Sequence, residues 1–105
     1  MNIFFYFETA FQAIVDKLIA HNLLPKNLDA SRVVFELPRE ASHGDLATNA
    51  AMVLAKQVGS SPRDLAKMFA GELQAMDGVT DVKIAGPGFL NIGVEAKLWT
   101  QEIAN

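Results

Sequence analysis

The chain of 105 residues has the length of one ordinary domain, and 50% of its residues are apolar, which is enough for a modest core. Cysteine is absent, which excludes a disulfide framework and a cysteine-ligated metal site and agrees with a cytoplasmic origin. The formal net charge of −3 argues against an autonomous nucleic-acid binder, because such proteins usually carry a basic excess. If the chain contacts RNA, we expect weak contact, as one part of a larger binding surface.

The apolar N-terminus lacks the features of a targeting or membrane segment. Residues 1–7 contain no basic region, and Glu8 interrupts the apolar run. No stretch approaches the roughly 18 to 20 uninterrupted apolar residues that a membrane span needs. We therefore expect a soluble protein with no membrane partner.

The first segment, from about Asn2 to Leu23, is predicted to be an amphipathic helix with Asn2 as its N-cap. Its large apolar residues recur at steps of three and four and so share one stripe: Phe4, Phe7, Phe11, Ile14 and Leu18. A stripe of this kind is typical of a core face.

A short strand is predicted next, from Val33 to Leu37, with Val33, Phe35 and Leu37 facing inward. After a polar loop, Asp45 is expected to cap a helix from about Leu46 to Val58.

A third helix is predicted to start at once, because Ser61 is a good cap, Pro62 suits the first helical position and Asp64 suits the first turn. Its apolar stripe comprises Leu65, Met68, Phe69, Leu73 and Met76, and Gly78 is expected to stop it.

Residues 79–94 are predicted to form two strands joined at Gly86-Pro87-Gly88, and side-chain parity decides the length of the turn. A two-residue loop would pair Ile84 with Asn91 and set a buried face against a polar one. A three-residue loop pairs Ile84 with Leu90, which keeps each face consistent. The element order is then α-β-α-α-β-β, an α+β two-layer fold with helices packed on one face of a small antiparallel sheet.

Arrangements that could support catalysis are scarce. His21 and His43 lie on different predicted elements without Glu or Cys at ligand spacing, which argues against a zinc site. His43-Gly44-Asp45 is better explained as a turn and a helix cap than as part of an acid–base pair. We expect no catalytic residue and no metal site in this chain.

Parity places Phe89 on the sheet face away from the helices, with Asn91 two residues on and Lys83 across from it. An exposed ring beside an amide and a cation suits an unstacked RNA base, through stacking, edge hydrogen bonds and phosphate attraction. The alternative is that Phe89 packs against another domain or folds back over the glycine-rich turn.

Three blocks of sequence occur in order along the chain. They are residues 42–49 (Ser-His-Gly-Asp-Leu-Ala-Thr-Asn) with 54–56, residues 62–66 (Pro-Arg-Asp-Leu-Ala), and residues 84–92 (Ile-Ala-Gly-Pro-Gly-Phe-Leu-Asn-Ile). Together they resemble the N-terminal additional domain of bacterial arginyl-tRNA synthetases over essentially the whole chain. Each block alone is a weak match, whereas three in the right order are specific.

The resemblance implies that the domain contacts the elbow of tRNA(Arg), where the D-loop meets the T-loop, and reads a D-loop nucleotide. The family's contacts come from the segment matching Gly86 to Asn91, which implies tRNA-binding roles for Phe89 and Asn91, with Gly86 and Lys83 beside them. A family position that can offer a polar side chain falls on Gly86, so that contact would be made by the backbone or be absent here.

The resemblance also implies that the active site lies in a following Rossmann-type catalytic domain with a His-x-Gly-His motif and a Lys-Met-Ser-Lys-Ser-like loop, neither of which occurs in residues 1–105. ATP with magnesium would bind there, so the chain alone is expected to hold no cofactor and to have no aminoacylation activity. Residues 1–105 are read as one domain, with about 95–105 starting the connection. The leading hypothesis is a tRNA-elbow module of an arginine–tRNA ligase, and the alternative is an interdomain protein-interaction domain without direct RNA contact.

Overall fold

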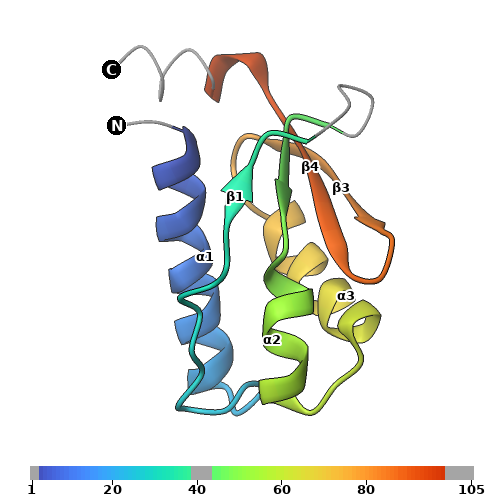
Figure 1. Cartoon of the computed structure of the whole chain (residues 1–105). Coiled ribbons are helices and arrows are strands. Elements are labelled where there is room, and N and C mark those ends of the chain that lie inside the picture. Colours follow the sequence, from blue (N-terminus) through green and yellow to red (C-terminus); the bar gives the residue numbers. More distant parts are fainter. Residues whose placement is uncertain (1–2, 39–43, 99–105) are drawn as a thin grey trace.

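The computed structural model describes residues 3–38 and 44–98, in which three main helices accompany a four-stranded sheet (Figure 1). The elements in chain order are α1 (Ile3–Ala20), β1 (Phe35–Glu36), β2 (Leu46–Thr48), α2 (Ala50–Val58), α3 (Pro62–Gln74), β3 (Val79–Ala85) and β4 (Phe89–Val94). No helix in these described ranges is long and apolar enough to cross a membrane.

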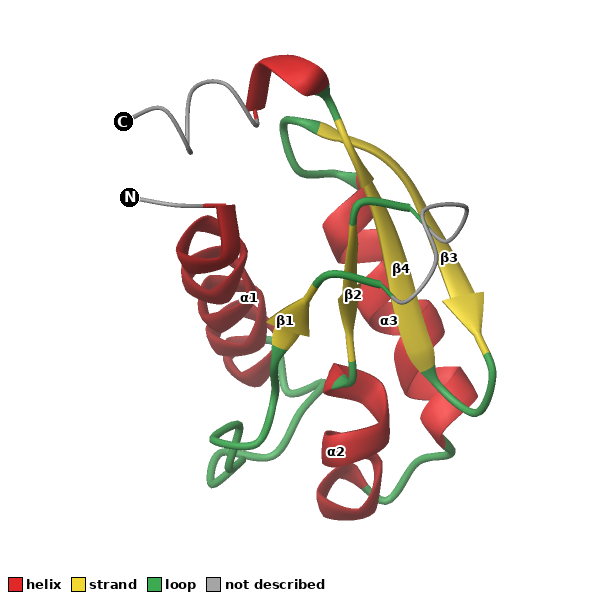
Figure 2. Cartoon of the chain, turned by 45° about the horizontal axis from the view of Figure 1, so that its top comes forward, coloured by secondary structure: helices red, strands yellow, loops and turns green. Residues whose placement is uncertain are grey.

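The strands lie in the order β1-β2-β4-β3, and every neighbouring pair is antiparallel. α3 crosses behind the sheet, α1 lies beside β1, and α2 continues from the end of β2 (Figure 2). The amide of Gln74 on α3 covers part of the free edge of β3, since it donates to the Thr80 carbonyl at 3.2 Å and accepts from the Val82 N–H at 3.1 Å. The predicted α+β class with a small antiparallel sheet is confirmed.

The predicted hairpin register is also confirmed. Ile84 pairs with Leu90 and Ala85 with Phe89, which leaves a three-residue turn at Gly86–Gly88. The two glycines of this turn have φ values of +56° and +143°, which L side chains rarely adopt. Glycine therefore makes the tight return possible.

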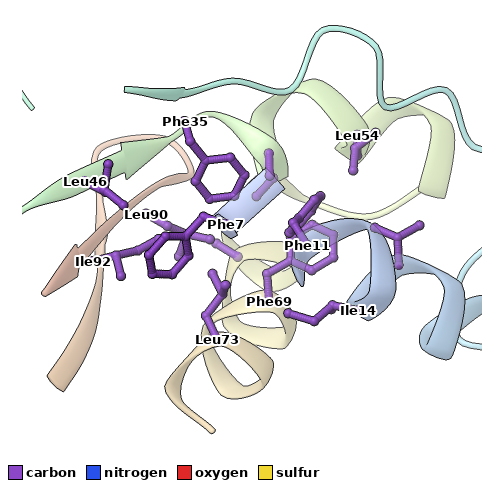
Figure 3. Packing of buried hydrophobic residues seen from close by; sticks show 14 of the residues in the cluster. Phe7, Phe11, Ile14, Phe35, Leu46, Leu54, Phe69, Leu73, Leu90 and Ile92 are labelled. Atoms are coloured by element: carbon purple, nitrogen blue, oxygen red, sulfur yellow. The ribbon is translucent and has the colours of Figure 1, made fainter. Parts of the chain in front are cut away.

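Aromatic rings join α1 to the rest of the core (Figure 3). The Phe11 ring lies edge-on to that of Phe69 on α3, with centroids 4.9 Å apart, and to that of Phe35 on β1 at 5.8 Å. Phe7 stacks on Phe35 at 6.0 Å. Two contacts at the rim add to this core: the Lys17 ammonium pairs with Glu72 at 2.8 Å, and the Tyr6 hydroxyl donates to the Asp77 carbonyl at 3.2 Å.

The first predicted helix is observed as α1, with Phe7, Phe11, Ile14 and Leu18 buried as expected. Phe4 is only half-buried, and Asn2, its predicted cap, lies outside the described residues. The start of α3 is confirmed in detail: Ser61 is the N-cap, its hydroxyl accepts the Asp64 N–H at 3.2 Å, and Pro62 opens the helix.

The predicted helix from Leu46 is wrong in its first turn. Leu46–Thr48 form strand β2, which pairs with β4, and α2 begins only at Ala50. The physical reason is that Leu46 and Thr48 are buried against the sheet's neighbours, and alternate burial of this kind requires extended backbone. The element order is therefore α-β-β-α-α-β-β.

The predicted strand from Val33 to Leu37 is too long, since β1 contains only Phe35 and Glu36. Phe35 faces inward as expected, and Val33 is half-buried, but Leu37 is 64% exposed. The strand ends early because β2 offers it partners only at Thr48 and Ala47, so Leu37 lies beyond the paired sheet.

Replacement of Phe11 by alanine is expected to reduce the free energy of unfolding by about 3 to 5 kcal/mol, because its ring is only 3% exposed and its loss leaves a large cavity. Urea denaturation of the chain measures the change. Phe5→Ala on the same helix is the control, since Phe5 is 51% exposed and should cost far less. Equal losses for the two variants would contradict the assigned core face of α1.

Candidate nucleic-acid interface

The face of the sheet away from the core, here called the outer face, carries Glu36, Ala47, Lys83, Ala85, Phe89 and Asn91. One row crosses all four strands, because Glu36 pairs with Ala47, Ala47 with Asn91, and Asn91 with Lys83. The alternation along β4 produces this face: Leu90 and Ile92 are fully buried, so the residues between and beside them point outward.

Phe89 and Asn91 occupy the part of the outer face nearest the hairpin turn. Phe89 is 37% exposed, and Asn91 is half-buried. The partners of Asn91 across the sheet are the small Ala47 on one side and Lys83 on the other. A planar group stacked on the Phe89 ring would therefore find an amide and an ammonium on the same face, without a bulky neighbour from β2.

The turn Gly86–Gly88 packs against the corner between α2 and α3. A Cβ atom at Gly88 would lie 2.8 Å from Cβ of Pro62 and 3.3 Å from Cγ of Met52, so only glycine allows this approach. The Arg63 guanidinium donates from Nη1 to the Gly86 carbonyl at 2.6 Å. Residues from both helices thus contact the turn that precedes Phe89.

The charge on the outer face is mixed. The side chain of Lys83 is 79% exposed, and its Nζ lies 4.0 Å from Oδ2 of Asp81, a long contact that leaves the ammonium largely hydrated. Glu36 is exposed at the far end of the row. Among the described residues, this face therefore offers one cation for a phosphate and no strong positive field, in line with the net charge of −3.

Asp45 has a different role from the predicted helix cap. Its N–H donates to the Ile92 carbonyl at 2.9 Å, and its Oδ2 accepts the Val94 N–H at 2.8 Å. A Cβ at Gly44 would lie 3.0 Å from the same Ile92 carbonyl oxygen. Gly44 and Asp45 thus attach the start of β2 to β4, while Ser42 and His43 of the same motif lie outside the described residues.

A cleft of about 230 Å³ lies between α1 and the segment before β1, away from the outer face. Its lining includes Glu8, Phe11, Gln12, Ser31 and Phe35. Nearby, the Ser31 N–H donates to the Asp29 carboxylate at 3.0 Å, and this hydrogen bond lowers the pKa of Asp29. That bond is an ordinary turn contact. Within the described ranges no group of three or more acidic or histidine side chains could hold a metal ion.

The structure brings three of the predicted site residues together on one face, Phe89, Asn91 and Lys83, and places the fourth, Gly86, in the adjoining turn. Their binding role stays a prediction. The contacts of Met52, Pro62 and Arg63 with the turn were not anticipated. The sequence held one signal for Arg63, its place in the block Pro-Arg-Asp-Leu-Ala. A helix start needs a cap and can use a proline, but it does not require an arginine, so local rules leave this residue unexplained.

Comparison with known proteins gives one consistent result. Residues 6–94 match the family model described as the arginyl tRNA synthetase N terminal domain. The chain is 49% identical over 104 residues to an arginine–tRNA ligase of Xanthobacter autotrophicus, and 48% identical over 103 residues to one of Parvibaculum lavamentivorans. These alignments cover 99% and 98% of the chain but only 18% of each relative's length.

Among solved structures, the fold matches arginyl-tRNA synthetase from Plasmodium falciparum with a TM-score of 0.70. The match covers 90% of the chain and 16% of that protein at 14% sequence identity, so it supports the fold alone.

Gly88→Ala is expected to lower the free energy of unfolding by about 1 to 3 kcal/mol, because the added methyl meets Pro62 and the φ of +143° is strained for any L side chain. Gly86→Asn is the matched control. Nothing lies within 4 Å of a Cβ there, and asparagine tolerates a φ of +56°, so the cost should stay below about 1 kcal/mol. If urea denaturation gives the same loss for both variants, close packing of the turn on Pro62 is refuted.

Proposed function

The chain belongs to the arginyl-tRNA synthetase N-terminal domain family, and on that premise we propose that it binds the D-loop at the elbow of tRNA(Arg) through its outer face. The observation that carries the proposal is the position of Phe89: a partly exposed ring at the hairpin turn, on the same face as Asn91 and Lys83. Single-stranded loop bases are recognised by such rings, and their edges by neighbouring amides.

Each of the three side chains has a distinct task in this proposal. The Phe89 ring stacks on an unpaired base, which contributes about 1 to 3 kcal/mol and tolerates any base. The Asn91 amide can donate to and accept from the base edge, so it supplies discrimination. The Lys83 ammonium attracts a phosphate beside the base and makes a small contribution, because it is strongly hydrated.

The parent protein in this proposal is a cytoplasmic arginine–tRNA ligase that attaches arginine to tRNA(Arg) at the expense of ATP. The domain takes no part in the chemistry; ATP with magnesium, arginine and the 3′ end of the tRNA bind in a catalytic domain, to which residues from about 95 onward connect. Because the described part of the outer face offers a single cation, its affinity for tRNA is low by itself, and the catalytic domain supplies the remaining contacts.

The competing function is a purely structural one, in which Phe89 packs against another domain of the same protein and RNA contact is absent. The mixed charge of the outer face is compatible with such a contact between domains. The hydrated Lys83 and the half-buried amide of Asn91 favour RNA, because protein–protein contacts are depleted in lysine at their centre.

Phe89→Ala in the full-length ligase is expected to raise the KM for tRNA by about one to two orders of magnitude, the loss of one stacked base. The KM values for ATP and arginine should not change, because those ligands bind elsewhere. Aminoacylation kinetics with a tRNA(Arg) transcript measure all three values. Circular dichroism and a melting curve on the same variant establish that the fold is retained.

Asn91→Ala is the comparison variant. It should reduce the preference for the natural D-loop nucleotide over substituted transcripts, because hydrogen bonds to the base edge specify the base whereas stacking does not. A Phe89→Ala enzyme that melts normally and charges tRNA normally would refute the RNA contact and leave the structural reading.

A further inference from the structure

The hairpin turn that precedes Phe89 depends on α3 for its position. Gly86–Gly88 contains two glycines with positive φ, so the backbone on either side of Pro87 has access to many conformations in the isolated turn. Three contacts with the helices restrict it: Pro62 and Met52 pack against Gly88, and Arg63 holds the Gly86 carbonyl. Of these, the Arg63 bond is the only directional one.

α3 is well suited to serve as a fixed support. Its first turn is stabilised by the Ser61 cap and by Pro62 at the first helical position. Further along the helix, Leu65 and Phe69 are buried in the core, so the helix cannot shift without disturbing it. Arg63 therefore reaches the turn from a rigid element, and its Nη1 lies 2.6 Å from the Gly86 carbonyl oxygen in a charge-assisted hydrogen bond at an exposed site.

We propose that Arg63 is a positioning residue for RNA recognition: its hydrogen bond to Gly86 fixes the turn and thereby holds the Phe89 ring in the orientation that a base can stack on. The inference rests on the proposed function and adds to it a residue outside the outer face. The physical reason is preorganisation, because a ring that is already ordered loses less entropy when the base binds.

The test uses the full-length ligase with Arg63→Met, which keeps most of the side-chain volume but removes the donor. The KM for tRNA should rise about 2- to 12-fold, the net effect of one hydrogen bond, with unchanged kcat and a melting temperature lowered by only a few degrees. Arg63→Lys should recover most of the loss, because an ammonium can also donate to a carbonyl. Hydrogen–deuterium exchange should be faster in peptides covering Gly86–Phe89 of the Arg63→Met enzyme and unchanged in α3.

Lys67→Met is the matched control for charge. Lys67 is exposed one helical turn after Arg63 on the same side of α3, so its loss removes a cation without affecting the turn, and the KM for tRNA should stay within about 2-fold of wild type. An increase equal to that of Arg63→Met would mean that general charge is responsible, and would overturn the proposal.

A double-mutant cycle separates positioning from direct contact. If Arg63 acts through Phe89, adding Arg63→Met to Phe89→Ala should change the KM for tRNA by less than about 2-fold, because the ring it orients is gone. Full additivity, together with a salt dependence reduced by about 0.7 in slope, would show that Arg63 contacts a phosphate itself, and would overturn the proposal. Unchanged exchange at the turn would also overturn it.

Failure of the proposed function has a different signature, because Phe89→Ala alone would then charge tRNA normally. The positioning role would be refuted along with it, even if exchange at the turn increased.

Discussion

The arrangement of the sheet residues depends on the burial of Leu90 and Ile92. Both lie on β4, the strand between β2 and β3, and both are completely buried. Side chains on a strand alternate between its faces, so Phe89 and Asn91 cannot point into the core while Leu90 and Ile92 do. A shift of the register by one residue would place an amide in the core and two leucine-sized groups in water. The orientation of the candidate interface is therefore stabilised by the hydrophobic energy of the whole core.

Contacts with β4 also explain why a glycine and an aspartate precede β2. Gly44 allows a close approach to the Ile92 carbonyl, and Asp45 accepts the Val94 N–H at 2.8 Å. These contacts attach β2 to the C-terminal end of β4. The turn at the N-terminal end of β4 is held by Pro62 and Arg63. β4 is thus fixed at both ends by polar or close backbone contacts, in addition to its buried face.

A net charge of −3 is unusual for a domain that contacts RNA, but the proposed interface does not depend on a positive surface. Stacking on an aromatic ring and hydrogen bonding at a base edge require shape and orientation more than a positive field. A domain that contributes one or two such contacts to a larger enzyme needs little affinity of its own. Low charge then also limits binding to unrelated nucleic acids, because non-specific affinity is almost entirely electrostatic.

Local chemistry determined much of this protein. The spacing of Phe7, Phe11 and Leu18 predicted the buried face of α1, and the cap and proline at Ser61 and Pro62 predicted the start of α3, because these signals act within one or two helical turns. Parity along β3 and β4 predicted the three-residue turn and the outward face of Phe89, because a period of two leaves no other consistent pairing.

Only the tertiary structure decided the elements whose partners are distant in the chain. Leu46–Thr48 became a strand because its partners on β4 lie 42 to 46 positions further along the chain, and a local pattern of small and apolar residues cannot reveal them. Leu37 became exposed because β2 ends its pairing with β1 one residue earlier. The contact of Arg63 with Gly86 spans 23 positions, and no spacing rule connects a helix start to a hairpin turn, so this contact became visible only when the chain was folded.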